Sequence, residues 1–155
     1  MSPDKDQLKK ITFESVSETF EAMIFSKVVA TDAPVSFVHN SEILFASIKS
    51  LSPVKGKMTL RIPPDMALGI TKDIYGWMEE EPPPQTMITD ALAELINTIA
   101  GRIMTRLIPV EKMFELSLPI TGTGKTPSAL PSTEYGYKLN DQVFSLLIEG
   151  ELCKG

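Results

Sequence analysis

The sequence is poor in the residues that form covalent cross-links and metal centres. Of its 155 residues one is a cysteine, Cys153, which excludes an internal disulfide and therefore a disulfide-rich secreted scaffold. One is a histidine, His39, which excludes the usual sites that bind a transition metal through several histidines. We therefore expect a protein that has no metal or cofactor of its own.

The sequence also lacks long apolar runs and an excess of basic charge. No segment approaches the roughly 20 consecutive apolar residues of a membrane-spanning helix. The first residues do not follow the basic and then apolar pattern of a signal peptide. The net charge of −5 is opposite in sign to the basic footprint of a nucleic-acid-binding protein. We expect a cytoplasmic protein that binds neither membranes nor nucleic acid.

What is present is typical of one globular domain, which we place at residues 1–155. Hydrophobic residues make up 43% of the chain and charged residues 23%, both near the average of folded domains. The length is enough for one hydrophobic core. Apolar residues at helical spacing predict helices at Gln7–Val28, from Pro64 or Asp65 toward Trp77, and, capped by Thr86 or Thr89, at about Asp90–Leu107.

Alternating apolar residues predict short strands that are separated by turn residues. The strands are expected at Val35–His39, Ile43–Ile48, Gly56–Ile62, Phe114–Leu118, Glu134–Leu139 and Val143–Glu149. Glycines, prolines and hydroxyl side chains predict a flexible loop at Thr121–Ser132. Because local strand pairs dominate and strands do not alternate regularly with helices, we predict a two-layer α+β fold. It has a mixed or antiparallel sheet of about six strands packed against about three helices.

The predicted helix at Asp90–Leu107 has two contrasting faces. A stripe of leucine and isoleucine residues faces the core. On the opposite side, four residues step by four, three and four positions and therefore form one outward row. We call this set the polar row; it consists of Asp90, Glu94, Asn97 and Gly101.

A solvated outer face is ordinary for a surface helix, and that interpretation of the polar row stays open. Two of its residues, however, weaken a helix. The amide of Asn97 competes with the backbone for hydrogen bonds, and a glycine such as Gly101 costs about 1 kcal/mol relative to alanine. Both residues suit a surface that another molecule approaches closely, so we interpret the polar row as a docking surface.

The spacing of these residues resembles a known family. Asp90, three residues, Glu94, two residues and Asn97 form the pattern, which continues with Gly101 and with a strand that ends at Pro119. This arrangement resembles the CheC/CheX/FliY phosphatases of bacterial chemotaxis. The resemblance implies the CheC-like fold over most of the chain.

The first predicted helix decides which branch of the family the sequence resembles. CheC-like members carry two such motifs, one on each of two helices. In the first helix here, Glu14 is followed by Ser17 and Glu18 by Glu21, so no Glu-x-x-Asn occurs. The single motif resembles the CheX-like branch.

The resemblance implies a chemistry for the polar row. Family members hydrolyse the aspartyl phosphate of a phosphorylated CheY-like response regulator, whose receiver domain supplies Mg²⁺. By resemblance, Glu94 pairs with a lysine of the regulator and Asn97 orients the attacking water. An amide suits that task because it donates and accepts hydrogen bonds without charge, and phosphoryl transfer needs mainly positioning and charge stabilisation.

The other residues of the motif are expected to position the site and its partner. Asp90 is expected in the first turn of the helix, where a carboxylate suits the helix dipole, and it also faces the partner. Pro119 is expected to end a strand. Gly101 permits close approach of the partner, which is an inference from the geometry of the row.

The CheX-like branch implies a homodimer whose sheets join edge to edge, and the alternating strand Val143–Glu149 is a candidate open edge. Other functions stay open: a non-catalytic adaptor that binds a receiver domain, or a dimerisation module of the same fold. Gly122–Thr126 resembles the tail of a phosphate-binding P-loop, but Pro119 stands where that motif needs its first glycine. We therefore expect a loop there and not a nucleotide site.

Overall fold

The computed structural model describes residues 4–32, 42–124 and 131–153 of the chain. Within these ranges it contains three α-helices and a sheet of seven strands, followed by a short 3-10 helix, η1. The predicted strand at Val35–His39 lies outside the described residues. The bounds are α1 Lys5–Ile24, β1 Val29–Thr31, β2 Leu44–Ser52, β3 Gly56–Ile62, α2 Pro64–Tyr75, α3 Gln85–Leu107, β4 Glu115–Leu116, β5 Ile120–Thr123, β6 Ser132–Leu139, β7 Gln142–Gly150 and η1 Glu151–Cys153.

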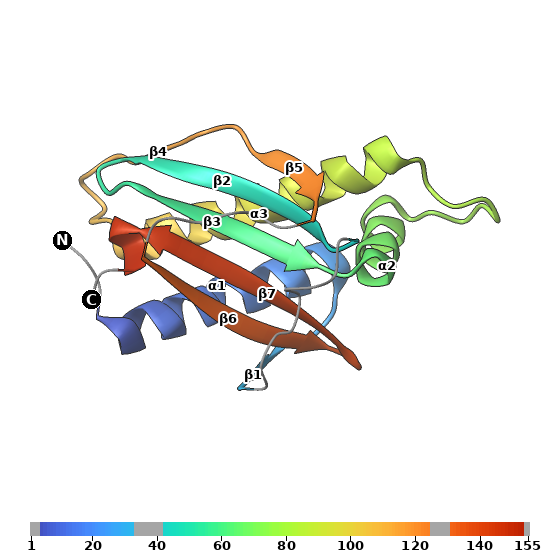
Figure 1. Cartoon of the computed structure of the whole chain (residues 1–155), viewed down its shortest axis with the longest axis horizontal. Helices are drawn as coiled ribbons and strands as arrows, with labels where there is room; N and C mark the ends of the chain where they lie inside the picture. The colour runs from blue at the N-terminus through green and yellow to red at the C-terminus, as the bar shows by residue number, and fades with distance from the viewer. Residues whose placement is uncertain (1–3, 33–41, 125–130, 154–155) are drawn as a thin grey trace.

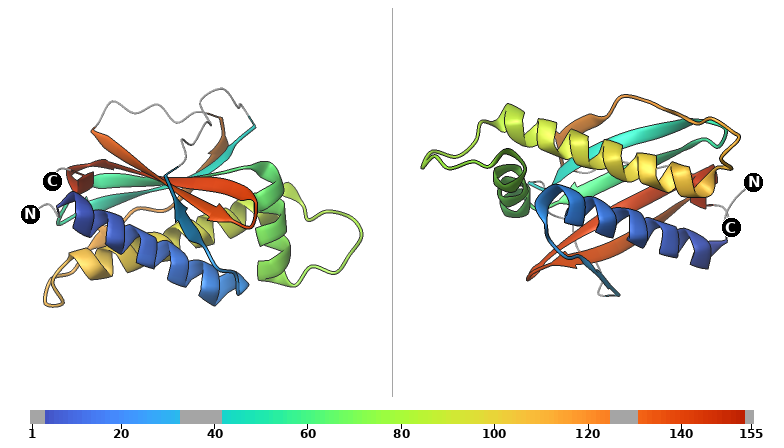
Figure 2. Two further views of the ribbon diagram at one scale, coloured as in Figure 1. Left: turned by 90° about the horizontal axis from the view of Figure 1, so that it is seen from below. Right: turned by 180° about the vertical axis from the view of Figure 1, so that it is seen from behind.

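The strands form one antiparallel sheet that is covered by helices on one face. Their order is β1-β6-β7-β3-β2-β4, and β5 also pairs with β2, alongside the same edge as β4. The helices α1 and α3 lie side by side beneath the sheet, and α2 packs at one end of them (Figures 1 and 2). The predicted two-layer α+β fold is confirmed, with seven strands in the described residues where about six were expected.

The helix α1 begins and ends earlier than the predicted span Gln7–Val28. At its start, the side chain of Asp4 accepts a hydrogen bond from the backbone N–H of Gln7 at 2.7 Å. This N-cap satisfies one of the free N–H groups of the first turn. At its end, Phe25 adopts a left-handed conformation with φ of 55°, which stops the helix before the strand β1.

The helix α3 begins at Gln85, before the predicted start at Asp90. Pro84 occupies the N-cap position in an extended conformation, and it makes no side-chain cap. The predicted caps Thr86 and Thr89 are therefore wrong, since both lie inside the helix. Proline suits the start of a helix because its missing N–H needs no partner there. Asp90 consequently lies beyond the first turn, and its expected place at the helix start is wrong.

The prediction of a loop at Thr121–Ser132 is wrong for the first residues of that range, because they belong to the strand β5. This strand pairs with the N-terminal half of β2, where Gly122 lies opposite Phe45. A Cβ atom at Gly122 would lie 2.7 Å from the ring of Phe45. The glycine thus leaves room for the Phe45 ring on the neighbouring strand, and it does not mark a flexible loop.

The hairpin of β6 and β7 turns at Asn140, which has a φ of 56°, as the predicted turn there requires. The strand β7 pairs with β6 on one side and with β3 on the other, so it lies inside the sheet. The expectation that Val143–Glu149 forms an open edge is therefore wrong. Among the described strands, the edges of the sheet are β1 on one side and β4 with β5 on the other.

The two long helices bury different kinds of side chain against the sheet. Phe20 of α1 stacks on Phe144 of β7 at 4.9 Å between ring centroids, and Phe13 contacts Tyr137 of β6 at 6.3 Å. The helix α3 buries only aliphatic side chains and methionine along its core stripe. No described helix is long and apolar enough to cross a membrane.

Candidate functional site

The polar row lies on the solvent side of α3. Asp90, Glu94 and Asn97 are exposed, and Gly101 is half-buried. The isoleucines on the opposite side of the same helix are fully buried, among them Ile96. With about 1.5 Å of rise per residue, Glu94 and Asn97 stand about 4.5 Å apart along the helix axis. The predicted outward row is confirmed as a feature of the fold.

The side chains of Glu94 and Asn97 are uncommitted. Within the described ranges of the chain, neither makes a hydrogen bond or an ion pair, and the same holds for Asp90. The carboxylate and the amide are therefore free to pair with groups of another molecule. Two carboxylates and one amide on one face can pair with a cation and orient a water molecule.

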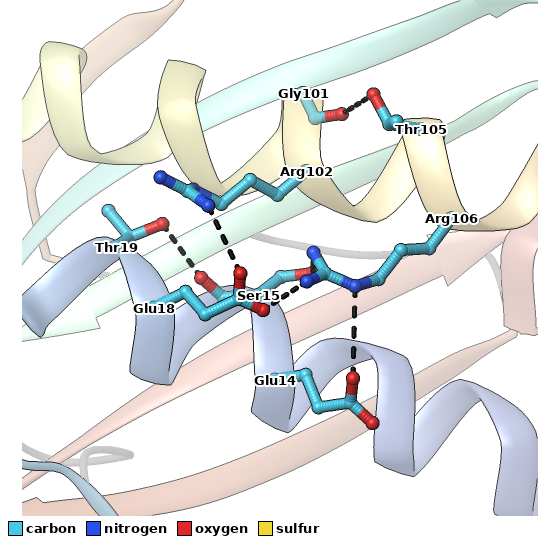
Figure 3. A network of polar contacts seen from close by, with 8 residues as sticks. All are labelled: Glu14, Ser15, Glu18, Thr19, Gly101, Arg102, Thr105 and Arg106. Carbon is cyan, nitrogen blue, oxygen red and sulfur yellow. Dashed lines mark hydrogen bonds and ion pairs between the residues drawn. The ribbon is translucent and has the colours of Figure 1, made fainter. Parts of the chain in front are cut away.

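Gly101 continues the row as a flat, open position. A Cβ atom built at this glycine meets nothing within 4 Å, so no contact within the described chain requires a glycine. Its carbonyl accepts a hydrogen bond from the hydroxyl of Thr105 at 2.7 Å (Figure 3). The absence of a side chain therefore leaves the backbone of α3 approachable from outside at this turn.

Pro119 lies apart from the polar row. The predicted strand Phe114–Leu118 shortens to β4, and Pro119 is half-buried in the link between β4 and β5. The strand β5, which starts at the next residue, lies beside α3 (Figure 1). The proline thus precedes the strand that flanks the helix, and the structure does not bring it into the row.

A network of ion pairs joins α1 to α3 on the side of α3 that faces α1 (Figure 3). Glu18 contacts both Arg102 and Arg106, and Arg106 also contacts Glu14, with its Nε 3.9 Å from the carboxylate. The sequence alone does not indicate this network. Its only trace in the sequence is a pair of acidic residues and a pair of basic residues, each spaced by four.

The groups with a shifted pKa lie on β6, away from the polar row. Burial raises the pKa of the Tyr137 hydroxyl, and the neighbouring Tyr135 raises it further. Burial also raises the pKa of Tyr135, with a smaller contribution from the charge of Cys153. These tyrosines belong to the part of the sheet that α1 covers. Their protonation therefore has no direct effect on the polar row.

No cluster of three or more histidine, cysteine, aspartate or glutamate side chains that suits a metal ion occurs in the part of the chain that the structure describes. The segment that resembles a P-loop tail begins in β5, where Gly122 and Thr123 are strand residues. A P-loop opens a helix, and no helix starts in the described part of this segment.

Comparison with protein-family models matches residues 44–139 to the model of the chemotaxis phosphatase CheX. A comparison with curated protein sequences gives no match.

Solved structures of chemotaxis proteins share the fold. The chemotaxis protein CheX of Vibrio vulnificus has a TM-score of 0.74 at 14% identity, over 92% of this chain and 95% of that one. CheX of Desulfovibrio desulfuricans has a TM-score of 0.74 at 17% identity, over 92% and 97%. CheX of Borrelia burgdorferi, in a complex with CheY, BeF3 and Mg²⁺, has a TM-score of 0.69 at 14% identity, over 90% and 95%. These likenesses confirm the CheC-like fold.

Proposed function

The chain belongs to the CheX chemotaxis phosphatase family, and we propose that it hydrolyses the aspartyl phosphate of a CheY-like response regulator. The observation that carries the proposal is the exposed pair of Glu94 and Asn97 on α3, which has no partner among the described residues. An amide and a carboxylate one turn apart can complete an active site on another protein.

Asn97 would orient the attacking water. Its amide oxygen accepts a hydrogen bond from the water and its NH₂ group donates one, and neither group carries a charge that repels phosphate. The oxygen of the water bonds to the phosphorus as the bond between phosphorus and the aspartyl oxygen breaks. The products are the free aspartate carboxylate of the regulator and inorganic phosphate, which carries the protons of the water. Such a reaction depends on position and charge stabilisation, so a single amide in the correct place is sufficient.

Glu94 would fix the helix on its partner by pairing with a lysine of the regulator. A charge-assisted hydrogen bond of this kind also sets the register of docking. Asp90 extends the same acidic face by one turn, and the open position at Gly101 lets the backbones approach.

The Borrelia CheX structure holds CheY and Mg²⁺, which supports a receiver domain as the partner here. We place Mg²⁺ in that receiver domain, where it would offset the charge of the phosphoryl group. The reactive aspartate, lysine and metal then all belong to the partner, and this chain contributes only the polar row.

We further propose a homodimer whose sheets join edge to edge. The strand β7 lies inside the sheet, so the available edges are β1 and the pair of β4 and β5. A molecular mass measured by light scattering near 34 kDa, twice the 17.1 kDa of one chain, supports this assembly. A mass of one chain at working concentration contradicts it.

The decay of a phosphorylated receiver domain tests the proposed reaction. Wild-type protein should accelerate the release of phosphate, and Asn97→Ala should reduce the acceleration about tenfold or more, because the water loses its hydrogen-bonding partner. Ser17→Ala on α1 is the matched control, since it stands in the corresponding position after Glu14. Equal acceleration by wild type and Asn97→Ala would contradict the role of Asn97.

The adaptor function predicts a different result in the same assay. An adaptor binds the phosphorylated receiver without changing the rate at which its phosphate is lost. A pull-down with a stable receiver complex but no acceleration therefore favours the adaptor, and no binding to any receiver favours a dimerisation module.

A further inference from the structure

We propose that the ion pairs between α1 and α3 hold α3 at one rotation about its axis, and that this rotation aims Asn97 at the phosphoryl group. Glu18, Arg102 and Arg106 are then positioning residues, because they act through Asn97 and do not touch the substrate. The inference rests on the proposed phosphatase function.

The central contact is one carboxylate between two arginines (Figure 3). One oxygen of Glu18 lies 3.3 Å from an Nη atom of Arg102, and its other oxygen contacts an Nη atom of Arg106. The two arginines are one helical turn apart, so the carboxylate holds α3 at two points. Turning α3 by the step of one residue, about 100°, would break both contacts.

A second set of contacts holds Arg106 from the next turn of α1. Its Nε atom lies 3.9 Å from Glu14, and its Nη1 group donates a hydrogen bond to the hydroxyl of Ser15 at 3.3 Å. Three residues of α1 therefore surround this one guanidinium. The fork geometry of arginine makes such contacts directional.

The rest of the α3 interface supplies little direction of this kind. Its core stripe consists of aliphatic side chains and methionine, with alanine at Ala91 and Ala100. Burial of this stripe decides which face of α3 points to the sheet, but apolar contacts have no preferred bond direction with which to fix the exact angle. The charged contacts with α1 are the directional part of this interface.

These charges face away from the polar row but lie close to it along the helix. Arg102 comes five residues after Asn97, which is about 7.5 Å along the axis. A rotation of α3 that relaxed the ion pairs would carry Asn97 with it. Phosphoryl transfer loses much of its rate when a positioning group moves by about 1 Å.

The same ion pairs should contribute little to the stability of the fold. The side chains of Arg102, Arg106 and Glu18 are 34%, 28% and 43% exposed, so water screens their attraction. Their loss should therefore appear in the catalysed rate more than in the unfolding temperature. This separation distinguishes positioning from a purely structural role.

The test compares Glu18→Gln with wild type in the decay of a phosphorylated receiver, over a range of concentrations of this protein. Glutamine keeps the shape of the side chain, but its NH₂ group faces an arginine without attraction. We expect the rate constant at saturation to fall about two- to fivefold, because part-exposed ion pairs hold the helix only weakly. The half-saturating concentration should change by less than about twofold, and the unfolding temperature should hardly change.

Two further variants control the result. Glu21→Gln makes the same charge change on the exposed side of α1 and should leave both kinetic constants at the wild-type values. Arg102→Gln removes one point of attachment and leaves the contacts of Arg106, so its loss of rate should be smaller than that of Glu18→Gln.

A saturating rate constant of Glu18→Gln equal to that of wild type overturns the proposal, and so does an equal loss in Glu21→Gln. Wild-type protein that gives no acceleration contradicts the proposed function itself and the positioning role with it. Active wild type with an equally active Glu18→Gln leaves the function in place and removes only the positioning role.

Discussion

The two long helices lie side by side on the same face of the sheet, yet they use their carboxylates in different ways. On α1, Glu14 and Glu18 are spaced by four residues and are both paired with arginines of α3. On α3, Asp90 and Glu94 have the same spacing and no partner in the described part of the chain. One helix thus supports its neighbour, and the other presents charge to the outside.

The difference teaches why one helix carries a candidate site and the other does not. A polar face alone does not mark a site, because α1 also has one. What distinguishes α3 is that its carboxylate and amide stay uncommitted after folding. Two independent reasons explain why α1 presents no second site. It lacks an asparagine at the matching position, and the carboxylate of Glu18 is held in ion pairs.

The largest expected effect tests what the two helices share, which is a buried face. Phe20→Ala on α1 removes a fully buried ring that stacks on Phe144. We expect a loss of about 3–5 kcal/mol in the free energy of unfolding, from lost burial and the cavity that remains. Denaturant titration measures it, with Phe25→Ala as control because that ring is 91% exposed. A similar loss in both variants would contradict this account of the core.

The next effect tests the difference in the carboxylates. Glu94→Gln should weaken binding of a phosphorylated receiver about ten- to a hundredfold, because a charge-assisted contact contributes roughly 1.5–3 kcal/mol. Glu21→Gln on α1 should leave the affinity unchanged. Titration calorimetry or fluorescence anisotropy with the receiver gives both values. An unchanged affinity of Glu94→Gln would show that the carboxylate has no part in docking.

Two helix glycines separate fold stability from docking. Gly69 of α2 and Gly101 of α3 both have nothing within 4 Å of a Cβ atom. Replacing either with alanine should raise the free energy of unfolding by about 0.5–1 kcal/mol. Only Gly101→Ala should also weaken receiver binding, since its methyl group would stand in the polar row. Equal affinities for both variants would contradict close approach at Gly101.

The smallest effect concerns the part of the sheet that α1 covers. The Tyr137 hydroxyl is buried and has no hydrogen-bond partner in the described residues. Tyr137→Phe should therefore be neutral or stabilising by up to about 1 kcal/mol at pH 7.

The pH dependence of the same variant follows from the raised pKa of Tyr137. A tyrosine in the unfolded chain releases its proton near pH 10, whereas the folded chain keeps it to higher pH. The ionisation of this group therefore leaves the free energy of unfolding unchanged below pH 10 and lowers it as the pH rises above that value. The free energy of unfolding, measured between pH 9 and pH 11, should decline less steeply with pH in Tyr137→Phe than in wild type. Identical slopes would contradict the role of this residue.

Several elements could be predicted from the sequence because local signals determined them. The strand β3 has the predicted bounds, since strict alternation ends at Pro63, and α3 ends at Leu107 as predicted, just before Pro109. The polar row followed from helical spacing alone. In each case the information lies within a few residues of the feature.

Other features depended on contacts between distant parts of the chain. The strand β5 pairs with β2, where Gly122 leaves room for the ring of Phe45, and the sequence around Gly122 on its own predicts a loop. The position of β7 inside the sheet follows from its pairing with β3. No local pattern in the sequence indicates this pairing. The contacts of Glu18 with Arg102 and Arg106 join positions 84 and 88 residues apart. Spacing within one helix does not indicate such partners.

The place of β7 has a consequence for how the protein is made. This strand lies inside the sheet between β3 and β6, yet it follows both of them in the sequence. During synthesis the edge of β3 must wait for roughly 80 further residues before β7 can cover it. At about 5–20 residues per second that delay is roughly 4–16 s. Until then the growing chain carries an unpaired apolar strand edge, the kind of surface that promotes aggregation and that chaperones cover.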